Sequence, residues 1–297
     1  MHANEYAIDT GLVRRLISEQ MPQWAHLPLK HMASAGTDNA IFRLGSDRCV
    51  RLPRIPSAQA QLKREQIWLP KFEGLSLSVP RVLATGEATD DYPSVWSVCD
   101  WIGGESAATA PLTDLNQAAI DLANLIRELR TIGTLGAPLA GPENHYRAVD
   151  LAKRDKPTRK AIAGLSDLYA SVDLTQIWNE ALELPKWDAP PVWCHGDIHA
   201  GNLLAREGRL VAVIDFGLMG VGDPAVDLIV GWSLLDTESR DLFRSAVSVN
   251  DDTWQRGRGW AFSIALVALA YYRDTNRYLA NMSRRVIEAV LKDTIGA

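Results

Sequence analysis

The chain has 297 residues, of which 47% are hydrophobic and 23% are charged, a composition that is ordinary for a soluble globular protein. It is long enough to bury a substantial core, in one large domain or in two modest ones. The formal net charge is −5 and no segment forms a basic stripe, which argues against a nucleic-acid-binding protein.

Export and membrane signals are absent from the sequence pattern. The first residues lack the basic and apolar regions of a signal peptide. The longest apolar run, Trp260 to Tyr272, is shorter than the about 20 residues that span a bilayer, so we expect a buried helix there. Cys49, Cys99 and Cys194 show no C-x-x-C spacing, which favours a reducing compartment over a disulfide framework or a structural zinc site. We therefore expect a cytoplasmic protein without a membrane partner.

The first hundred residues read as one helix followed by short strands. Thr10 can cap a helix with an apolar face, which Pro22 ends. The turn Gly45–Arg48 between two apolar runs predicts a hairpin. In chain order, the elements expected after the first helix are the hairpin at 40–52, a helix at 58–72, and strands at 79–84 and 95–101. Gly103-Gly104 then forms a candidate hinge.

Helices dominate after this hinge. Leu115 to Leu129 repeats apolar residues at steps of three and four, which predicts an amphipathic helix. A loop is expected at 133–146, a strand at 191–194, and a hairpin from the runs 203–205 and 210–214. Strands first and helices later predict an α+β protein of two lobes, residues 1–102 and 103–297.

One segment gathers polar residues between apolar strands: Val192-Trp-Cys-His-Gly-Asp-Ile-His-Ala-Gly-Asn, followed by Val213-Ile-Asp-Phe-Gly. It places Asp197, Asn202 and Asp215 on loops, where a rigid scaffold presents catalytic groups. Their hard oxygen donors are the type that Mg²⁺ selects while keeping room for phosphate oxygens and water. Asp197 remains as a proton acceptor for an attacking hydroxyl.

This combined motif resembles the catalytic loop and the metal-binding triplet of the aminoglycoside phosphotransferase family, relatives of the protein kinases. The resemblance covers nearly the whole chain. It implies a bilobal protein-kinase-like fold, with a small antiparallel-sheet N-lobe and a mainly helical C-lobe. It also implies that Asp197 is the catalytic base, that Asn202 and Asp215 hold Mg²⁺, and that ATP or GTP donates the phosphate.

The first lobe would then bind the nucleotide. A Gly-containing turn precedes the hairpin, and Arg51 stands where many family members have Lys, with Glu65 placed to orient it. An exposed hairpin charge is the alternative for Arg51. The residues expected to bind nucleotide are Ser34, Gly36, Thr37, Asp38, Asn39, Arg51, Glu65 and, through backbone groups that meet a purine, Val98 and Asp100.

Other polar residues near the motif are expected to have structural or acceptor-binding roles. Asp227, in a G-D-P-x-x-D-L stretch that resembles the family's, is expected to brace the catalytic loop through backbone hydrogen bonds. His195 has either a structural or a direct role, and His199 is expected to be a bystander. Residues 133–160 are expected to line part of the acceptor cleft, with His145, Tyr146, Arg147, Asp150 and Asp155.

Three other classes of protein share single features of this sequence. Gly220-Val-Gly-Asp-Pro-Ala225 matches a dinucleotide fingerprint, but helices rather than a parallel βαβ unit are expected after it, which excludes an oxidoreductase. His195, Asp197 and His199 could belong to a metallohydrolase, yet the other four histidines form no cluster with them. A nucleotide-binding pseudokinase is supported only by Arg51.

The acceptor is the least determined part of this hypothesis. Residues 1–100 contain 11 basic and 11 acidic residues, so the whole negative excess lies in residues 101–297. An acidic second lobe suits a polycationic aminoglycoside, although surface acidity that serves solubility is the simpler cause. A macrolide, or a metabolite of the choline or homoserine type, is the alternative acceptor. The expected phosphate donor is ATP or GTP, and the expected assembly is a monomer or a homodimer.

Overall fold

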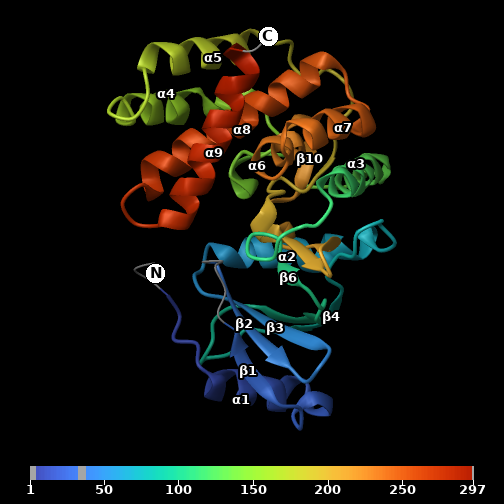
Figure 1. The fold of residues 1–297 in the computed structure, drawn as a ribbon. Helices are drawn as coiled ribbons and strands as arrows, with labels where there is room; N and C mark the ends of the chain where they lie inside the picture. The colour runs from blue at the N-terminus through green and yellow to red at the C-terminus, as the bar shows by residue number, and fades with distance from the viewer. Residues whose placement is uncertain (1–4, 33–37, 296–297) are drawn as a thin grey trace.

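The computed structural model describes residues 5–32 and 38–295. Figure 1 shows two lobes, one with helix α1 and strands β1 to β5, the other mainly helical, with α2 lying between them. The predicted α+β bilobal architecture is confirmed. Within the described residues, no helix combines the length and the apolar character that crossing a membrane requires.

Helix α1 (Thr10–Gln20) covers the small sheet with Leu12, Val13, Leu16 and Ile17. Its cap differs from the prediction by one residue. The Asp9 carboxylate accepts a hydrogen bond from Leu12 N at 2.7 Å, so Asp9 and not Thr10 is the N-cap. Aspartate is the stronger capping residue, and its charge also suits the positive end of the helix.

The small sheet is antiparallel, with strand order β1-β2-β3-β5-β4. The predicted hairpin is formed by β2 (Asn39–Leu44) and β3 (Arg48–Pro53). The remaining strands are β1 (Leu29–Met32), β4 (Val82–Gly86) and β5 (Trp96–Asp100). Strand β4 begins later than predicted because Pro80 lacks the N–H that a ladder requires.

Helix α2 (Ala58–Trp68) ends earlier than predicted. Pro70 stops the regular helix, and a short 3₁₀ turn, η2 (Leu69–Phe72), follows. The helix contacts β3 and β5 in one lobe and the turn η6 (Phe216–Leu218) in the other. Its buried Glu65 is thereby placed between the small sheet and the turn η6.

The second lobe contains the predicted helices and two small sheets. Its helices are α3 (Leu115–Thr131), α4 (Asp155–Gly164), α5 (Ser171–Glu183), α6 (Val230–Ser233), α7 (Thr237–Val247), α8 (Asp251–Tyr272) and α9 (Arg277–Ile295). The apolar stripe of α3 is buried, and so is most of the run at the end of α8, as predicted. Strand β7 (Val192–Cys194) pairs with β10 (Gly220–Gly222), while β6 (Glu105–Ser106), β8 (Leu203–Arg206) and β9 (Arg209–Val213) form the other sheet.

The packing of the cores does not follow chain order throughout. One apolar cluster fills the small lobe, between α1 and its sheet. The larger cluster fills the helical lobe and also takes in Leu69, Phe72, Leu77 and Val79 from the first hundred residues. The segment after α2 therefore packs on the helical lobe before the chain returns to the small sheet in β4.

Candidate active site

The loop between β7 and β8 brings the predicted catalytic residues together. Asn202 donates from Nδ2 to the backbone oxygen of Asp197 at 3.0 Å and to its carboxylate Oδ2 at 3.3 Å. The β8–β9 hairpin then returns the chain to the same place, because Ile214 N donates to Asn202 O at 2.9 Å. Asp215, the next residue, consequently lies beside this loop.

The carboxylate of Asp197 is held by side chains from two segments. Arg147 Nη2 lies 3.3 Å from Oδ1, and His199 Nε2 lies 3.6 Å from Oδ2. Burial opposes ionisation, but the charge of Arg147 and the hydrogen bond from His199 outweigh it, so the pKa of Asp197 lies well below its usual range. The group is ionised and able to accept a hydrogen bond from a hydroxyl.

Asn202 and Asp215 provide a donor set that fits Mg²⁺. Asn202 uses its Nδ2 toward Asp197, which leaves its amide oxygen for another partner. The Asp215 carboxylate is exposed and makes no hydrogen bond or ion pair within the described part of the chain. Two hard oxygen donors on neighbouring loops suit an ion that is also bound by phosphate oxygens and water.

The two histidines of the motif differ in role. The ring of His195 is fully buried, with Nδ1 accepting from Asp197 N at 3.2 Å and Nε2 at 3.0 Å from Ile214 O. Both nitrogens are engaged with the backbone, so this side chain is structural. His199 is not the expected bystander, because it touches Asp197, and Gly201 N fixes its ring through Nδ1 at 3.0 Å.

The expected bracing role of Asp227 is confirmed. Its two carboxylate oxygens accept from His195 N at 2.8 Å and from Gly196 N at 2.7 Å. The side chain is buried, so no water can replace these bonds.

We expect Asp227→Ala to lower the free energy of unfolding by about 1–3 kcal/mol for each orphaned N–H. Urea unfolding measures this effect, with Asp251→Ala as the control, since the Asp251 carboxylate is 86% exposed. Equal, small losses in both variants would show that Asp227 does not brace the loop.

Arg51 and Glu65 form a buried ion pair, with 2.8 Å between Nη1 and Oε2. The Arg51 side chain is only 10% exposed, so the alternative of an exposed hairpin charge is wrong. The other oxygen of Glu65 accepts from Phe216 N at 2.9 Å. The carboxylate therefore links Arg51 to the segment that contains Asp215.

Sequence comparison assigns the chain that forms this site to a known family of proteins. Residues 32–260 match the family described as "Phosphotransferase enzyme family". The chain belongs to this family. The resemblance inferred from the motif is thereby confirmed.

Two curated proteins that are similar to this chain are aminoglycoside 3'-phosphotransferases. That of Escherichia coli is 26% identical over 181 residues, 59% of this chain and 63% of the relative. That of Salmonella typhimurium is 25% identical over 178 residues, again 59% and 63%. The chain thus aligns with less than two thirds of the length of these relatives.

Solved structures share the fold of this chain at low sequence identity. The GDP complex of wild-type aminoglycoside 2'-phosphotransferase-IIIa gives a TM-score of 0.71 at 15% identity, covering 97% of this chain and 100% of the other. The macrolide 2'-phosphotransferase MphH from Brachybacterium faecium gives 0.63 at 17%, covering 95% and 97%. At this identity, the likeness establishes the fold alone.

Most of the predicted nucleotide-binding residues that the structure describes lie in the small sheet, whereas Glu65 lies in α2. Ser34, Gly36 and Thr37 fall outside the described residues. Asp38 O accepts from Arg54 N at 2.7 Å, and the Oδ1 of Asn39 is buried without a hydrogen-bond partner in the described structure.

The two residues expected to meet a purine both lie in β5. Val98 is fully buried and lies between Val50 of β3 and Ala84 of β4. Asp100 ends β5, and its carboxylate accepts from Arg81 N at 2.7 Å. Asp100 N donates to Arg81 O at 3.0 Å, and Trp101 N donates to Asp47 O at 2.8 Å, so these two N–H groups are engaged within the chain.

The expected acceptor region contributes one side chain that contacts Asp197. Arg147 reaches Asp197, whereas Asp150 pairs with Lys186 at 2.6 Å. Asp155 accepts from Arg159 at 2.7 Å and from the Trp178 indole at 2.8 Å. These two carboxylates are therefore engaged within the second lobe.

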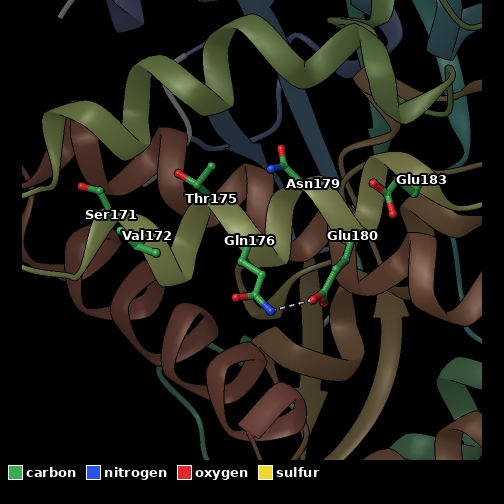
Figure 2. Close-up of a pocket in the computed structure, with 7 residues that line it drawn as sticks. All are labelled: Ser171, Val172, Thr175, Gln176, Asn179, Glu180 and Glu183. Atoms are coloured by element: carbon green, nitrogen blue, oxygen red, sulfur yellow. Dashed lines mark hydrogen bonds between the residues drawn. The ribbon is translucent and has the colours of Figure 1, made fainter.

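The described structure also has a pocket outside the predicted site. Figure 2 shows a pocket along α5 between Ser171 and Glu183, whose lining includes none of the predicted site residues. Among the described residues, no three His, Cys, Asp or Glu side chains are grouped to hold a metal ion.

Proposed function

We propose that this chain transfers the γ-phosphoryl group of ATP or GTP to a hydroxyl of a small molecule. The observation that carries this proposal is the convergence of Asp197, Asn202 and Asp215 on two adjoining loops, with Asn202 bonded to the base. Membership of the phosphotransferase family supports it. The ionised base and the buried Arg51–Glu65 pair argue against a pseudokinase.

In this mechanism, Asp197 accepts the proton of the acceptor hydroxyl and orients the oxygen toward the phosphorus. Arg51, held by Glu65, would bind phosphate oxygens of the nucleotide. Asn202 and Asp215 would hold Mg²⁺, which neutralises charge on the phosphate oxygens when bound. Phosphoryl transfer of this type depends on positioning and electrostatics more than on covalent chemistry.

The acceptor that we propose is an aminoglycoside, which would make the protein an antibiotic-resistance kinase. Two observations support this class: the curated relatives are named aminoglycoside 3'-phosphotransferases, and the negative excess lies in residues 101–297. A macrolide, or a metabolite of the choline or homoserine type, is the alternative acceptor.

A coupled nucleotide-consumption screen tests the proposal. Purified protein with Mg²⁺ and ATP or GTP is assayed against aminoglycosides, macrolides and amino-alcohol metabolites, and products are identified by mass spectrometry. We expect turnover that depends on one acceptor class. Turnover with only a macrolide or only a metabolite would show that the proposed acceptor class is wrong. Nucleotide binding without phosphoryl transfer to any acceptor would favour the pseudokinase.

The Arg51–Glu65 pair gives a prediction of its own. Removing either residue should lower kcat/KM for the nucleotide, and removing both should cost little more than removing one, because each acts through the other. Contacting residues depart from additivity by about 0.5–3 kcal/mol in a double-mutant cycle. Arg51→Lys should retain part of the activity, since Lys keeps the charge but loses the bidentate fork.

Four variants measure this coupling: Arg51→Ala, Arg51→Lys, Glu65→Ala and the double alanine variant. The exposed pair Arg15 and Asp91, 3.2 Å apart, is the matched control, for which we expect no effect on nucleotide use. Small and strictly additive losses at Arg51 and Glu65 would exclude the clamp.

A further inference from the structure

The segment 141–148 carries an unusual concentration of backbone strain. His145, Tyr146 and Ala148 have φ angles of 53°, 58° and 62°, in the left-handed region that side chains with a Cβ rarely adopt. Three such residues surround Arg147. Strain of this kind persists only where the surroundings enforce it, and it is concentrated at functional sites.

Hydrogen bonds tie this segment to the catalytic elements. The buried Asn144 accepts from Gly141 N at 2.9 Å and donates to Arg147 O at 3.1 Å and Leu218 O at 3.3 Å. Ala148 O accepts from Asp223 N at 2.8 Å. The strained backbone is thus held at both ends.

Two glycines allow the segment to approach this closely. A Cβ on Gly196 would lie 3.1 Å from Arg147 Cβ and 2.6 Å from Leu218 O. A Cβ on Gly222 would lie 2.1 Å from Ala148 O. Gly196 is the residue next to Asp197, so the approach brings Arg147 directly to the base.

Arg147 uses only part of its guanidinium in this place. Nη2 lies 3.3 Å from Asp197 Oδ1, while Nη1 is buried and has no hydrogen-bond partner in the described structure. An ion pair that served stability alone would be expected to satisfy its buried donors, since each unpaired one is costly. The one side-chain hydrogen bond that Arg147 makes within the described residues goes to the Asp197 carboxylate, so this contact can fix where the carboxylate lies.

We propose that Arg147 is a positioning residue for phosphoryl transfer. It holds the Asp197 carboxylate through Oδ1, opposite the bond from Asn202 to Oδ2, and so sets the direction in which the base meets the acceptor hydroxyl. This inference rests on the proposed function, because it assigns Arg147 to the same reaction. It adds a contact from outside the motif that contains Asp197, Asn202 and Asp215.

Steady-state kinetics of Arg147→Gln and Arg147→Lys test the role. We expect Arg147→Gln to lower kcat about 10²-fold, as a small misplacement of a reacting group does, while KM for the nucleotide stays unchanged. Arg147→Lys should recover at least about tenfold of that loss, because it restores the charge. In an Asp197→Asn background, Arg147→Gln should not lower kcat any further.

Arg244→Gln is the matched control, since Arg244 pairs with Asp251 at 2.8 Å outside the site, and we expect native kinetics from it. Native kcat in Arg147→Gln would overturn the proposal. A rise in KM with unchanged kcat, or equal losses in the Gln and Lys variants, would also overturn it.

A crystal structure of the Arg147→Gln protein gives a readout that does not depend on turnover. We expect the Asp197 carboxylate to rotate away from the position that Asn202 and Arg147 define. An unmoved carboxylate would overturn the role of Arg147 even if the kinase is active. If the wild-type protein phosphorylates no acceptor, the proposed function fails, and this structure still decides whether Arg147 positions Asp197.

Discussion

Replacing Asp197 by asparagine is expected to lower the rate of phosphoryl transfer about 10²–10⁴-fold, the usual contribution of a general base. Asparagine has nearly the same shape, so the fold and the contacts of Asn202 should survive. Its amide cannot take the proton of the acceptor hydroxyl. The nucleotide should still bind, because Arg51 and the Asn202–Asp215 pair are unchanged.

The measurement is kcat with saturating acceptor, together with the nucleotide dissociation constant from calorimetry. Asp251→Asn is the control, because its carboxylate is 86% exposed and belongs to no part of the site. Near-native turnover of Asp197→Asn would remove this residue from the mechanism.

Replacing Asp215 is expected to affect nucleotide binding as well as rate. Loss of this carboxylate leaves Asn202 as the one remaining protein donor of the proposed pair. Even residues that only support a metal ligand contribute about 10–100-fold to metal affinity, so loss of a direct ligand should weaken the Mg²⁺-dependent binding of nucleotide by at least that factor.

Two variants separate this effect from backbone strain. Asp215 has a φ angle of 65°, which asparagine tolerates better than alanine does. Asp215→Asn therefore keeps the local conformation while removing the charge, and Asp215→Ala removes the side chain. Nucleotide is titrated with and without Mg²⁺, with exposed Asp188→Ala as the control. The assignment is wrong if both Asp215 variants keep the metal dependence of the wild type.

The grouping of Asp197, Asn202 and Asp215 could be predicted because these residues are close in sequence and joined by short elements. Asp197 and Asn202 share one loop, and a tight hairpin returns Asp215 to them. The partnership of Arg51 with Glu65 was also predicted, on the resemblance to kinases. These contacts depend on local geometry or on a motif that fixes the order of strands and helices.

Contacts between distant segments could not be predicted in this way. Arg147 lies 50 residues before Asp197, and the buried Arg64, which donates to Gly217 O at 2.9 Å, lies 153 residues before that glycine. Neither arginine belongs to a motif. Loop 141–148 brings Arg147 to Asp197 through positive φ angles that no sequence pattern predicts. The contact of His199 with Asp197 had a local signal, since the two residues are close neighbours in the sequence.

Element boundaries depended on single residues. The apolar pattern predicted a helix to residue 72 and a strand from residue 79. In the structure, the helix ends before Pro70 and the strand begins after Pro80. The N-cap is Asp9 and not the predicted Thr10, because the Asp9 carboxylate accepts a hydrogen bond from Leu12 N in the first turn of the helix. The packing of Leu77 and Val79 on the second lobe depends on long-range contacts that periodicity does not encode.

Following the γ-phosphoryl group itself tests the central claim most directly. Nucleotide labelled on the γ-phosphate is incubated with Mg²⁺, the acceptor found in the screen, and either wild-type protein or Asp197→Asn. The wild type should move the label onto an acceptor hydroxyl, and the variant should do so about 10²–10⁴-fold more slowly. Label that appears only as inorganic phosphate, or that transfers equally fast in both proteins, would contradict the assignment of this site as a small-molecule kinase with Asp197 as its base.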